Sequence, residues 1–523
     1  MTRVAAALAA VLTAAPPAAA GDWYVNINDP SCAGGSGGPS DPFCDIVDAL
    51  NVAAAGDTIF VFPGKYFEQL TIAKSVTIRA LPSMPVPIVD GSSTGRVITL
   101  GSNVQVEVRS MQIANGSHAQ NGGGIFVPAG SSLVLRSCSV TKCFADNGGG
   151  IDNAGTLTLF NSTVSNNSAT NDSGGIRNRA GGTLTAMDCV IATNRSMYGT
   201  TGVSNFVGGT MTLVRTTVSG GHTCYGSGAV GNGGNATLAN CTVSFNYALY
   251  DGGGIKNSGT LAVTDSTVTS NTAAAGVGGG LHNRSGGTIT IDRSTITKNG
   301  AGVGGGIYNT GVVYLGGTIV ADNSVAGSFG PDLSGHFRSN GYNLIGDTND
   351  ATFSGNETGN LYNVDPRLGN LADHGGPTAT HGLLAGSPAI DAGPPGAAGC
   401  RPDQRGAPRA DGDCDGVKRC DIGAFEVALT LNASTSQVFP GSTLKFVTMV
   451  GLPGSLSALF VADVGGIPLF LLLDAGALDG SGQRTYSATV PAGLADLTAT
   501  FLAFGFDPCT DLVATNLEVV LFR

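Results

Sequence analysis

The sequence is poor in charged residues and has no long uninterrupted apolar run. Charged residues make up 12% of its 523 positions, against roughly 25% in an average soluble protein. The 37 acidic residues outnumber the 26 basic ones, which gives a net charge of −11 and disfavours nucleic acid and anionic membrane surfaces as partners. No apolar run reaches the roughly 18 residues that cross a bilayer, so we expect no transmembrane segment.

Motifs for common metal and nucleophile sites are also missing. The 11 cysteines include no Cys-x-x-Cys pair, which leaves a zinc or thioredoxin-type site without a motif. The 6 histidines are scattered along the chain and mark no nucleophile–base pair. Cys32 and Cys44 bracket a short Gly/Ser/Pro loop, so we expect them to form a disulfide. Cys400, Cys414 and Cys420 form a second local cluster whose pairing stays open.

The N-terminal residues 1–20 follow the pattern of a secretory signal peptide. They combine a basic start at Arg3, an apolar stretch and an Ala-x-Ala sequence just before Gly21. We therefore expect the mature chain to be secreted or held at the cell surface, where disulfides are permitted.

Glycine, by contrast, is abundant, with 81 residues, and it recurs at a fixed spacing. Glycine-rich stretches precede an apolar anchor every 25 to 27 residues, at Ile125, Ile151, Ile176, Val203, Val230, Ile255, Leu281 and Ile307. Each unit holds three short β-prone runs, so the period indicates a β-solenoid with three short strands per coil of about 26 residues. The scarcity of charge follows, since stacked parallel coils enclose columns of aliphatic side chains.

Asparagine recurs in two further columns of the repeat. One column lies two positions after the anchor and comprises Asn153, Asn178, Asn205, Asn232, Asn257, Asn283 and Asn309. The other follows the third strand and comprises Asn167, Asn194, Asn246, Asn271, Asn299 and Asn323. Because an amide both donates and accepts hydrogen bonds, we interpret both columns as structural ladders between coils.

The start of the solenoid resembles a known cap. Residues 45–55 place Ile46, Leu50, Ala53 and Ala54 on one helical face, and a strand-like run follows from residue 57. This segment resembles the capping helix and first coil of the pectate-lyase-like superfamily of right-handed parallel β-helices. Residues 57–330 resemble the polymorphic-outer-membrane-protein type of repeat. The resemblance implies an all-β, right-handed parallel β-helix over residues 21–427.

Residues 340–427 resemble the bacterial choice-of-anchor Q family. The resemblance rests on Asn343-Leu344-Ile345-Gly346, Asp365-Pro366-Arg367-Leu368-Gly369, Gly375-Gly376-Pro377-Thr378, Ser387-Pro388-Ala389-Ile390-Asp391, Asp403-Gln404-Arg405-Gly406 and Cys420-Asp421-Ile422-Gly423. It implies a segment that closes the helix ahead of an anchoring signal. Residues 428–523 instead alternate β-prone runs with Pro/Gly turns, so we expect a small C-terminal β-sandwich there.

An acidic stretch near the end of this segment suggests a cation site. Asp411, Asp413 and Asp415, with Gly416 behind them, match the first half of a calcium loop, and Asp421 lies near its end. The bidentate glutamate of such a loop is missing. The sequence leaves two interpretations, a structural calcium ion or an acidic turn held by its cysteines.

The repeat changes character over three consecutive coils. Tyr198, Tyr225 and Tyr250, here called the tyrosine ridge, share one register, and a polar row of Arg195, His222 and Tyr247 lies three positions before them. In the same stretch Gly221 replaces a ladder asparagine. Flat rings cover sugar faces and polar tips bind hydroxyls, so these six residues form our candidate carbohydrate-binding site. The alternative is an aromatic stack that closes a larger turn.

Support for catalysis is weaker. Polygalacturonase-type β-helix enzymes use an Asp-Asp pair, a Gly-His-Gly and an Arg-x-Lys, none of which occurs here. Asp152 and Arg177 share one outward column, which we interpret as a surface ion pair. We therefore predict a non-enzymatic exported protein for adhesion or carbohydrate binding, with no catalytic residues assigned. The alternative is a divergent polysaccharide lyase or glycoside hydrolase.

Overall fold

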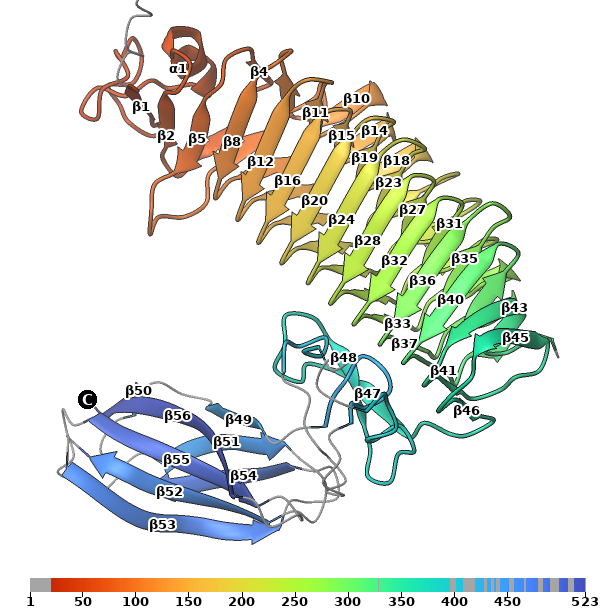
Figure 1. Cartoon of the computed structure of the whole chain (residues 1–523). Helices are drawn as coiled ribbons and strands as arrows, with labels where there is room; N and C mark the ends of the chain where they lie inside the picture. The colour runs from red at the N-terminus through yellow and green to blue at the C-terminus, as the bar shows by residue number, and fades with distance from the viewer. Residues whose placement is uncertain are drawn as a thin grey trace, which may run out of the picture.

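The computed structural model describes residues 20–327, 329–395, 401–407 and 419–427, together with the backbone of strands between residues 430 and 522. Residues 20–362 form the predicted parallel β-helix, seen side-on in Figure 1. Its coils run through four faces, and the strands of each face pair in parallel with those of the next coil. The long β43 (Leu333–Asn340) joins the first two faces, so the helix has three sheets, of 24, 13 and 9 strands.

The strands of the four faces follow one another in each coil. The first face holds β4 (Leu70–Ile72), β7 (Ile98–Leu100), β11 (Ile125–Val127), β15 (Ile151–Asn153), β19 (Ile176–Asn178), β23 (Val203–Asn205), β27 (Val230–Asn232), β31 (Ile255–Asn257), β35 (Leu281–Asn283) and β39 (Ile307–Asn309). The second holds β1 (Asp22–Val25), β2 (Thr58–Val61), β5 (Thr77–Ala80), β8 (Gln105–Arg109), β12 (Ser132–Arg136), β16 (Thr156–Phe160), β20 (Thr183–Met187), β24 (Thr210–Val214), β28 (Asn235–Ala239), β32 (Thr260–Thr264), β36 (Thr288–Asp292), β40 (Val312–Gly316) and β45 (Ala351–Asn356). The third holds β3 (Lys65–Tyr66), β6 (Ile88–Asp90), β9 (Gln112–Ala114), β13 (Ser139–Thr141), β17 (Thr163–Ser165), β21 (Val190–Ala192), β25 (Thr217–Ser219), β29 (Thr242–Ser244), β33 (Thr267–Thr269), β37 (Thr295–Thr297), β41 (Ile319–Ala321), β44 (Leu344–Ile345) and β46 (Leu361–Tyr362). The fourth holds β10 (Ser117–Asn121), β14 (Phe144–Asn147), β18 (Ser168–Asp172), β22 (Arg195–Ser196), β26 (His222–Thr223), β30 (Tyr247–Ala248), β34 (Thr272–Val277), β38 (Gly300–Val303) and β42 (Ser324–Val325).

The first three faces are the three strands per coil that the repeat predicts, and the fourth face is an addition that the sequence pattern did not reveal. All eight apolar anchors of the repeat are completely buried in the first face. In-register stacking places them in one continuous aliphatic column, because neighbouring parallel strands lie about 4.8 Å apart. This column and those of the other faces form the core of the helix.

Both asparagine columns form the predicted ladders. In the first, the amide of Asn153 donates to Asn178 Oδ1 at 2.7 Å, and the chain of side-chain bonds continues without a gap to Asn309. In the second, Asn246 donates to Asn271 Oδ1 at 2.9 Å, and the chain continues to Asn323. Asp332 accepts the last bond of this second ladder. The ladders satisfy buried backbone groups at the corners of the coils, where no strand can do so.

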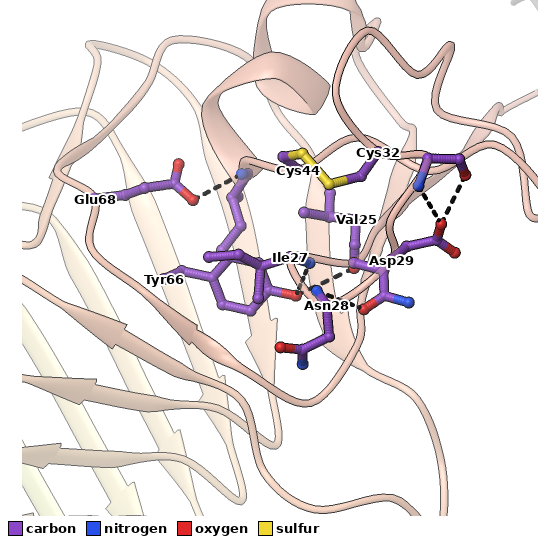
Figure 2. The surroundings of a disulfide bond; sticks show 11 residues. Val25, Ile27, Asn28, Asp29, Cys32, Cys44, Tyr66 and Glu68 are labelled. Atoms are coloured by element: carbon purple, nitrogen blue, oxygen red, sulfur yellow. Dashed lines mark hydrogen bonds between the residues drawn. A yellow bond between two sulfur atoms is a disulfide. The ribbon is translucent and has the colours of Figure 1, made fainter.

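The N-terminal end of the helix is covered by α1 (Ile46–Val52) and a disulfide-closed loop. Figure 2 shows the expected Cys32–Cys44 disulfide, beside which the buried Tyr66 hydroxyl donates to Val25 O. The Glu68 carboxylate accepts 2.8 Å bonds from the first backbone amides of α1, at Ile46 and Val47.

The cap is smaller than the sequence pattern indicated. Ile46, Leu50 and Ala53 are buried as expected, but Ala54 is exposed because the helix ends at Val52. The prediction for Ala54 was therefore wrong. Among the described residues no helix is long and apolar enough to cross a membrane.

The described residues of 366–427, here called the closing segment, fold back against the third face (Figure 1). The segment includes the hairpin of β47 (Leu368–Ala372) and β48 (Thr380–Leu383). Gln404 Oε1 accepts a 2.6 Å bond from the Thr267 hydroxyl, and Ala389 and Ile422 pack against Ile319. Cys420 is disulfide-bonded.

The C-terminal strands form two further sheets. One contains β49 (Thr430–Ala433), β51 (Thr443–Val450) and β54 (Gln483–Thr489). The other contains β50 (Gln437–Val438), β52 (Leu456–Val464), β53 (Ile467–Ala477), β55 (Thr498–Phe506) and β56 (Leu512–Phe522). All of their pairings are antiparallel except that of β50 with β56, in keeping with the small β-sandwich expected there.

Removing one rung of a ladder should destabilise the helix. In Asn257→Ala, the Asn232 amide loses an acceptor and Asn283 Oδ1 loses a donor, both of them buried. We expect the free energy of unfolding in urea to fall by about 2–4 kcal/mol. Asn235→Ala, on the exposed second face, is the matched control and should change it by less than about 0.5 kcal/mol. Equal effects of the two substitutions would contradict a stabilising role for the ladder.

Acid should weaken the docking of the closing segment through His381. This buried ring donates from Nδ1 to Gly369 O, and its Nε2 lies 3.0 Å from Thr269 Oγ1. Burial lowers the pKa of His381 from 6.5 to about 4, so the unfolded chain takes up this proton at a higher pH than the folded chain. The stability supplied by the neutral ring is complete above pH ~6.5 and is lost as the pH falls towards 4, by up to about 3 kcal/mol.

The measurement is the difference in Tm between the wild type and His381→Gln, followed from about pH 7 to about pH 4.5. Because both proteins share every other titrating group, the difference isolates His381. We expect it to shrink as the pH falls, and a constant difference would show that folding does not lower the pKa of His381.

Candidate functional site

The fourth face and the turns that follow its strands bring the six predicted site residues onto the same three coils. Arg195 of β22 pairs with His222 of β26, and His222 pairs with Tyr247 of β30, so the polar row is one column on three consecutive coils. The His222 and Tyr247 rings stack, with centroids 4.8 Å apart and planes 10° apart. In-register pairing dictates this contact, because the distance between the two ring centroids is nearly the same as the distance between neighbouring strands.

The tyrosine ridge lies on the turns that follow these short strands. The Ser196 hydroxyl accepts a bond from the Gly199 amide at 2.9 Å, and the Thr223 hydroxyl accepts one from Gly226 at 3.0 Å. These side-chain-to-backbone bonds give two consecutive turns the same shape. Glycine follows Tyr198 and Tyr225, and at Gly226 it is required, since a Cβ there would lie 2.1 Å from Gly199 O; Asp251 follows Tyr250.

The ridge presents its rings to solvent. Tyr198 and Tyr225 are each 55% exposed and stack with centroids 5.5 Å apart, and Tyr250 on the next coil is 46% exposed. Rings that served only to fill an enlarged turn would be buried. The half-exposed stack therefore favours a contact surface over the alternative of a turn-closing aromatic stack.

The ladder break at Gly221 has a steric cause. The Gly221 amide still donates to Asn246 Oδ1 at 2.9 Å. A Cβ at Gly221 would lie only 2.0 Å from the Thr201 hydroxyl oxygen, so the Thr201 side chain occupies the space that a ladder asparagine would fill. Thr201 belongs to the loop that carries Tyr198, which links the break in the ladder to the altered turns.

A hollow of about 270 Å³ lies beside the ridge, on the outer surface of the first face. We call it the Gly231 hollow. It is lined by Asp172, Thr200, Ser204, Asn205, Phe206, Val207, Ser227, Gly231, Asn232, Gly233, Lys256 and Ser258. The sequence pattern did not identify it. The sequence does hold a signal for this hollow. Several coils carry a large side chain at the position directly after the anchor, whereas the coil of Val230 has Gly231 there.

Charged groups stand at both ends of this hollow. At one end, Arg177 Nε lies 3.4 Å from Asp172 Oδ2, and the Ser204 hydroxyl donates to the same oxygen. At the other end, Lys256 Nζ lies 3.2 Å from Asp251 Oδ2. Burial raises the pKa of Asp172 above its ordinary value, against the opposing effect of Arg177.

Asp152 and Arg177 form the predicted ion pair, but its placement on the surface was wrong. The Asp152 side chain is completely buried, and Arg177 NH1 lies 3.8 Å from it. Its nearer partner is Arg179, which holds both carboxylate oxygens and lies over the Phe126 ring. Arg96 lies over the same ring, so guanidinium groups from neighbouring coils cover the carboxylate and exclude water.

The proposed calcium ligands fall largely outside the described residues. Asp411, Asp413 and Asp415 lie in residues 408–418, so the calcium site stays a prediction. Asp421 is described, and its two carboxylate oxygens accept backbone bonds from Asp391 and Val427. Burial and the neighbouring Glu426 raise the pKa of Asp421 well above its ordinary value. Within the described part of the chain, no group of three or more His, Cys, Asp or Glu side chains could hold a metal ion.

Removing the Asp152 carboxylate should lower the free energy of unfolding. In Asp152→Ala the clustered guanidinium groups lose their buried counter-charge, so we expect unfolding to become easier by about 3–5 kcal/mol. Asp188, which pairs with Arg215 at 2.6 Å on a partly exposed corner, offers the control Asp188→Ala, for which we expect at most about 1 kcal/mol. Urea unfolding measures both. A small loss for Asp152→Ala would contradict its assignment as a buried structural charge.

Comparisons with known proteins concern the fold. No family model matches the sequence, and no curated protein matches it. Among solved structures, pectate lyase Pel9A matches with 13% identity and a TM-score of 0.43, over 78% of this chain and 96% of that chain. The complex of XylC with xylose matches with 11% identity and a TM-score of 0.42, over 78% and 98%. A tailspike protein, gp49 of Acinetobacter baumannii bacteriophage Fri1, a capsular polysaccharide depolymerase, has 11% identity and a TM-score of 0.29, over 91% and 79%. At these values we take no functional argument from the matches.

Proposed function

We propose that this chain is an exported β-helix protein that binds a polysaccharide along its tyrosine ridge. The observation that carries the proposal is the half-exposed, stacked pair of Tyr198 and Tyr225, continued by Tyr250 on the next coil. Aromatic rings at a regular spacing suit a polymer whose sugar faces also repeat. Arg195 and His222 supply polar tips within the same three coils.

Binding is favoured over catalysis by the chemistry around the ridge. A lyase or hydrolase requires carboxylates, or a carboxylate and a base, that converge on the reacting sugar. The lining of the Gly231 hollow contains one carboxylate and one amine, and each has a partner of opposite charge. An enzyme of this fold remains the second candidate, and a product assay distinguishes the two.

The sequence motifs are the basis of a proposal for how the protein is exported and organised. We propose that residues 1–20 direct export, that the coils are repeats of the polymorphic-outer-membrane-protein type, and that residues 340–427 are a choice-of-anchor Q segment. The closing segment packs on the third face and covers the side of the last coils there. The C-terminal strands would then serve attachment or recognition.

Truncating the ridge should abolish binding without unfolding the protein. We expect the double variant Tyr225→Ala with Tyr250→Ala to lose detectable binding on a glycan array, because it removes the flat apolar surface from two coils. Circular dichroism should be unchanged, since both rings are about half exposed and lie outside the core. The exposed Phe245→Ala is the matched aromatic control.

Two results would count against this function. Full binding by the double variant would remove the ridge from the site. Release of unsaturated or reducing sugar products by the wild type would replace binding with the enzymatic alternative.

A further inference from the structure

The Gly231 hollow and the tyrosine ridge are parts of one surface. Thr200 follows Tyr198 by two residues, Ser227 follows Tyr225 by two residues, and both Thr200 and Ser227 line the hollow. The loops that hold two rings of the ridge therefore also form one wall of the hollow. A chain lying on the ridge would meet the hollow without leaving the protein surface.

Gly231 lines the hollow without a side chain of its own. Ser204 of β23, Gly231 of β27 and Lys256 of β31 are consecutive members of one outward column. A Cβ at Gly231 would lie 2.6 Å from the Thr200 hydroxyl oxygen, so a larger residue would displace the Thr200 side chain, which also lines the hollow. From Arg177 to Lys256 the column spans three strand spacings, about 14 Å.

The walls combine polar and apolar groups. Asp172 offers acceptors, Lys256 offers donors, and the hydroxyls of Ser227 and Ser258 offer both. Thr200 precedes β23, whereas Phe206 and Val207 follow it. Phe206 is 40% exposed and Val207 is 74% exposed. Hydroxyl-reading groups beside an exposed ring suit a sugar, which has polar edges and an apolar C–H face.

The charges that line the hollow are compensated before any ligand binds. Arg177 pairs with Asp172, and Asp251 pairs with Lys256. An uncharged ligand would leave these pairs intact. A carboxylated sugar would approach Lys256 but would also face Asp172 and the Asp251 carboxylate, and burying an unpaired charge is costly.

We infer that the Gly231 hollow is a second subsite of the glycan-binding surface and that it takes uncharged sugar residues rather than uronates. This inference rests on the proposed function, because the hollow extends the ridge. It names the class of sugar at this subsite as neutral.

Filling the hollow is the first test. Gly231→Val places a branched side chain in the hollow while keeping a residue suited to a strand, and Thr237→Val, on the exposed second face of the same coil, is the matched control. The probes are soluble β-glucan, mannan and galactan, measured by isothermal titration calorimetry with the full-length protein. We expect Gly231→Val to raise the Kd of the bound neutral glycan by about tenfold or more, which is about 1.4 kcal/mol, and Thr237→Val to leave it unchanged.

Two further variants keep the test valid if Gly231→Val does not fold. Lys256→Met removes a donor from the lining, and Asp172→Asn replaces one acceptor oxygen by a donor NH2 group and removes the charge; we expect each to weaken binding by roughly fivefold. Lys142→Met, at an exposed lysine on another face, is the control. Unchanged Kd values for both lining variants would overturn the subsite.

Polygalacturonate and alginate provide the selectivity test. We expect them to bind at least about tenfold more weakly than the neutral glycan, and we expect neutral-glycan binding to be insensitive to added salt. Tighter binding of a polyuronate that is lost with the ridge variants would overturn this inference while keeping the proposed function. Absence of binding to every probe would instead contradict the proposed function itself.

Discussion

The backbone hydrogen bonds between successive coils are the constraint on which the rest of the structure depends. The Ile151 amide donates to Gly175 O at 2.9 Å, Ile176 donates to Gly202 O at 2.8 Å, and the pattern continues along the helix. These bonds hold each residue directly above its counterpart in the next coil. Every recurring residue therefore becomes a column, whether aliphatic inside, amide at the corners or aromatic outside.

The corner ladders explain how a chain with so little charge satisfies its buried polar groups. An asparagine amide donates and accepts at once, so one residue type can repeat along the ladder without a change of partner. At Gly221 the ladder is interrupted and Thr201 fills the space. The interruption coincides with the three coils that carry the polar row and the tyrosine ridge. The asparagine ladder is therefore broken in the same coils in which aromatic and basic residues replace the usual small polar residues of the surface.

The sequence predicted those features that depend on a single register. The buried anchors, both asparagine columns, the Cys32–Cys44 disulfide and the alignment of the six aromatic and polar residues follow from spacing alone. Features that combine residues from different positions of the repeat were not predictable in this way. Asp152 was assigned to the surface because its burial depends on Arg96 and Arg179, which come from other coils and other positions in the repeat.

The Gly231 hollow was missed for the same reason. Its walls come from loops before and after the first face in different coils, and Gly231 lines it without a side chain of its own. The fourth face was missed because some of its strands are only two residues long, too short for a periodic pattern. Both the fourth face and the Gly231 hollow border the ridge. The structure therefore adds a strand face and a hollow to a site that the sequence had located only by its aromatic and polar residues.

A crystal structure of the protein with a bound neutral oligosaccharide tests the central claim most directly. The account predicts sugar rings stacked on Tyr198 and Tyr225, with a neighbouring sugar seated over Gly231 between Asp172 and Lys256. An oligosaccharide bound on the second face, or elsewhere with the ridge and the hollow unoccupied, would contradict it.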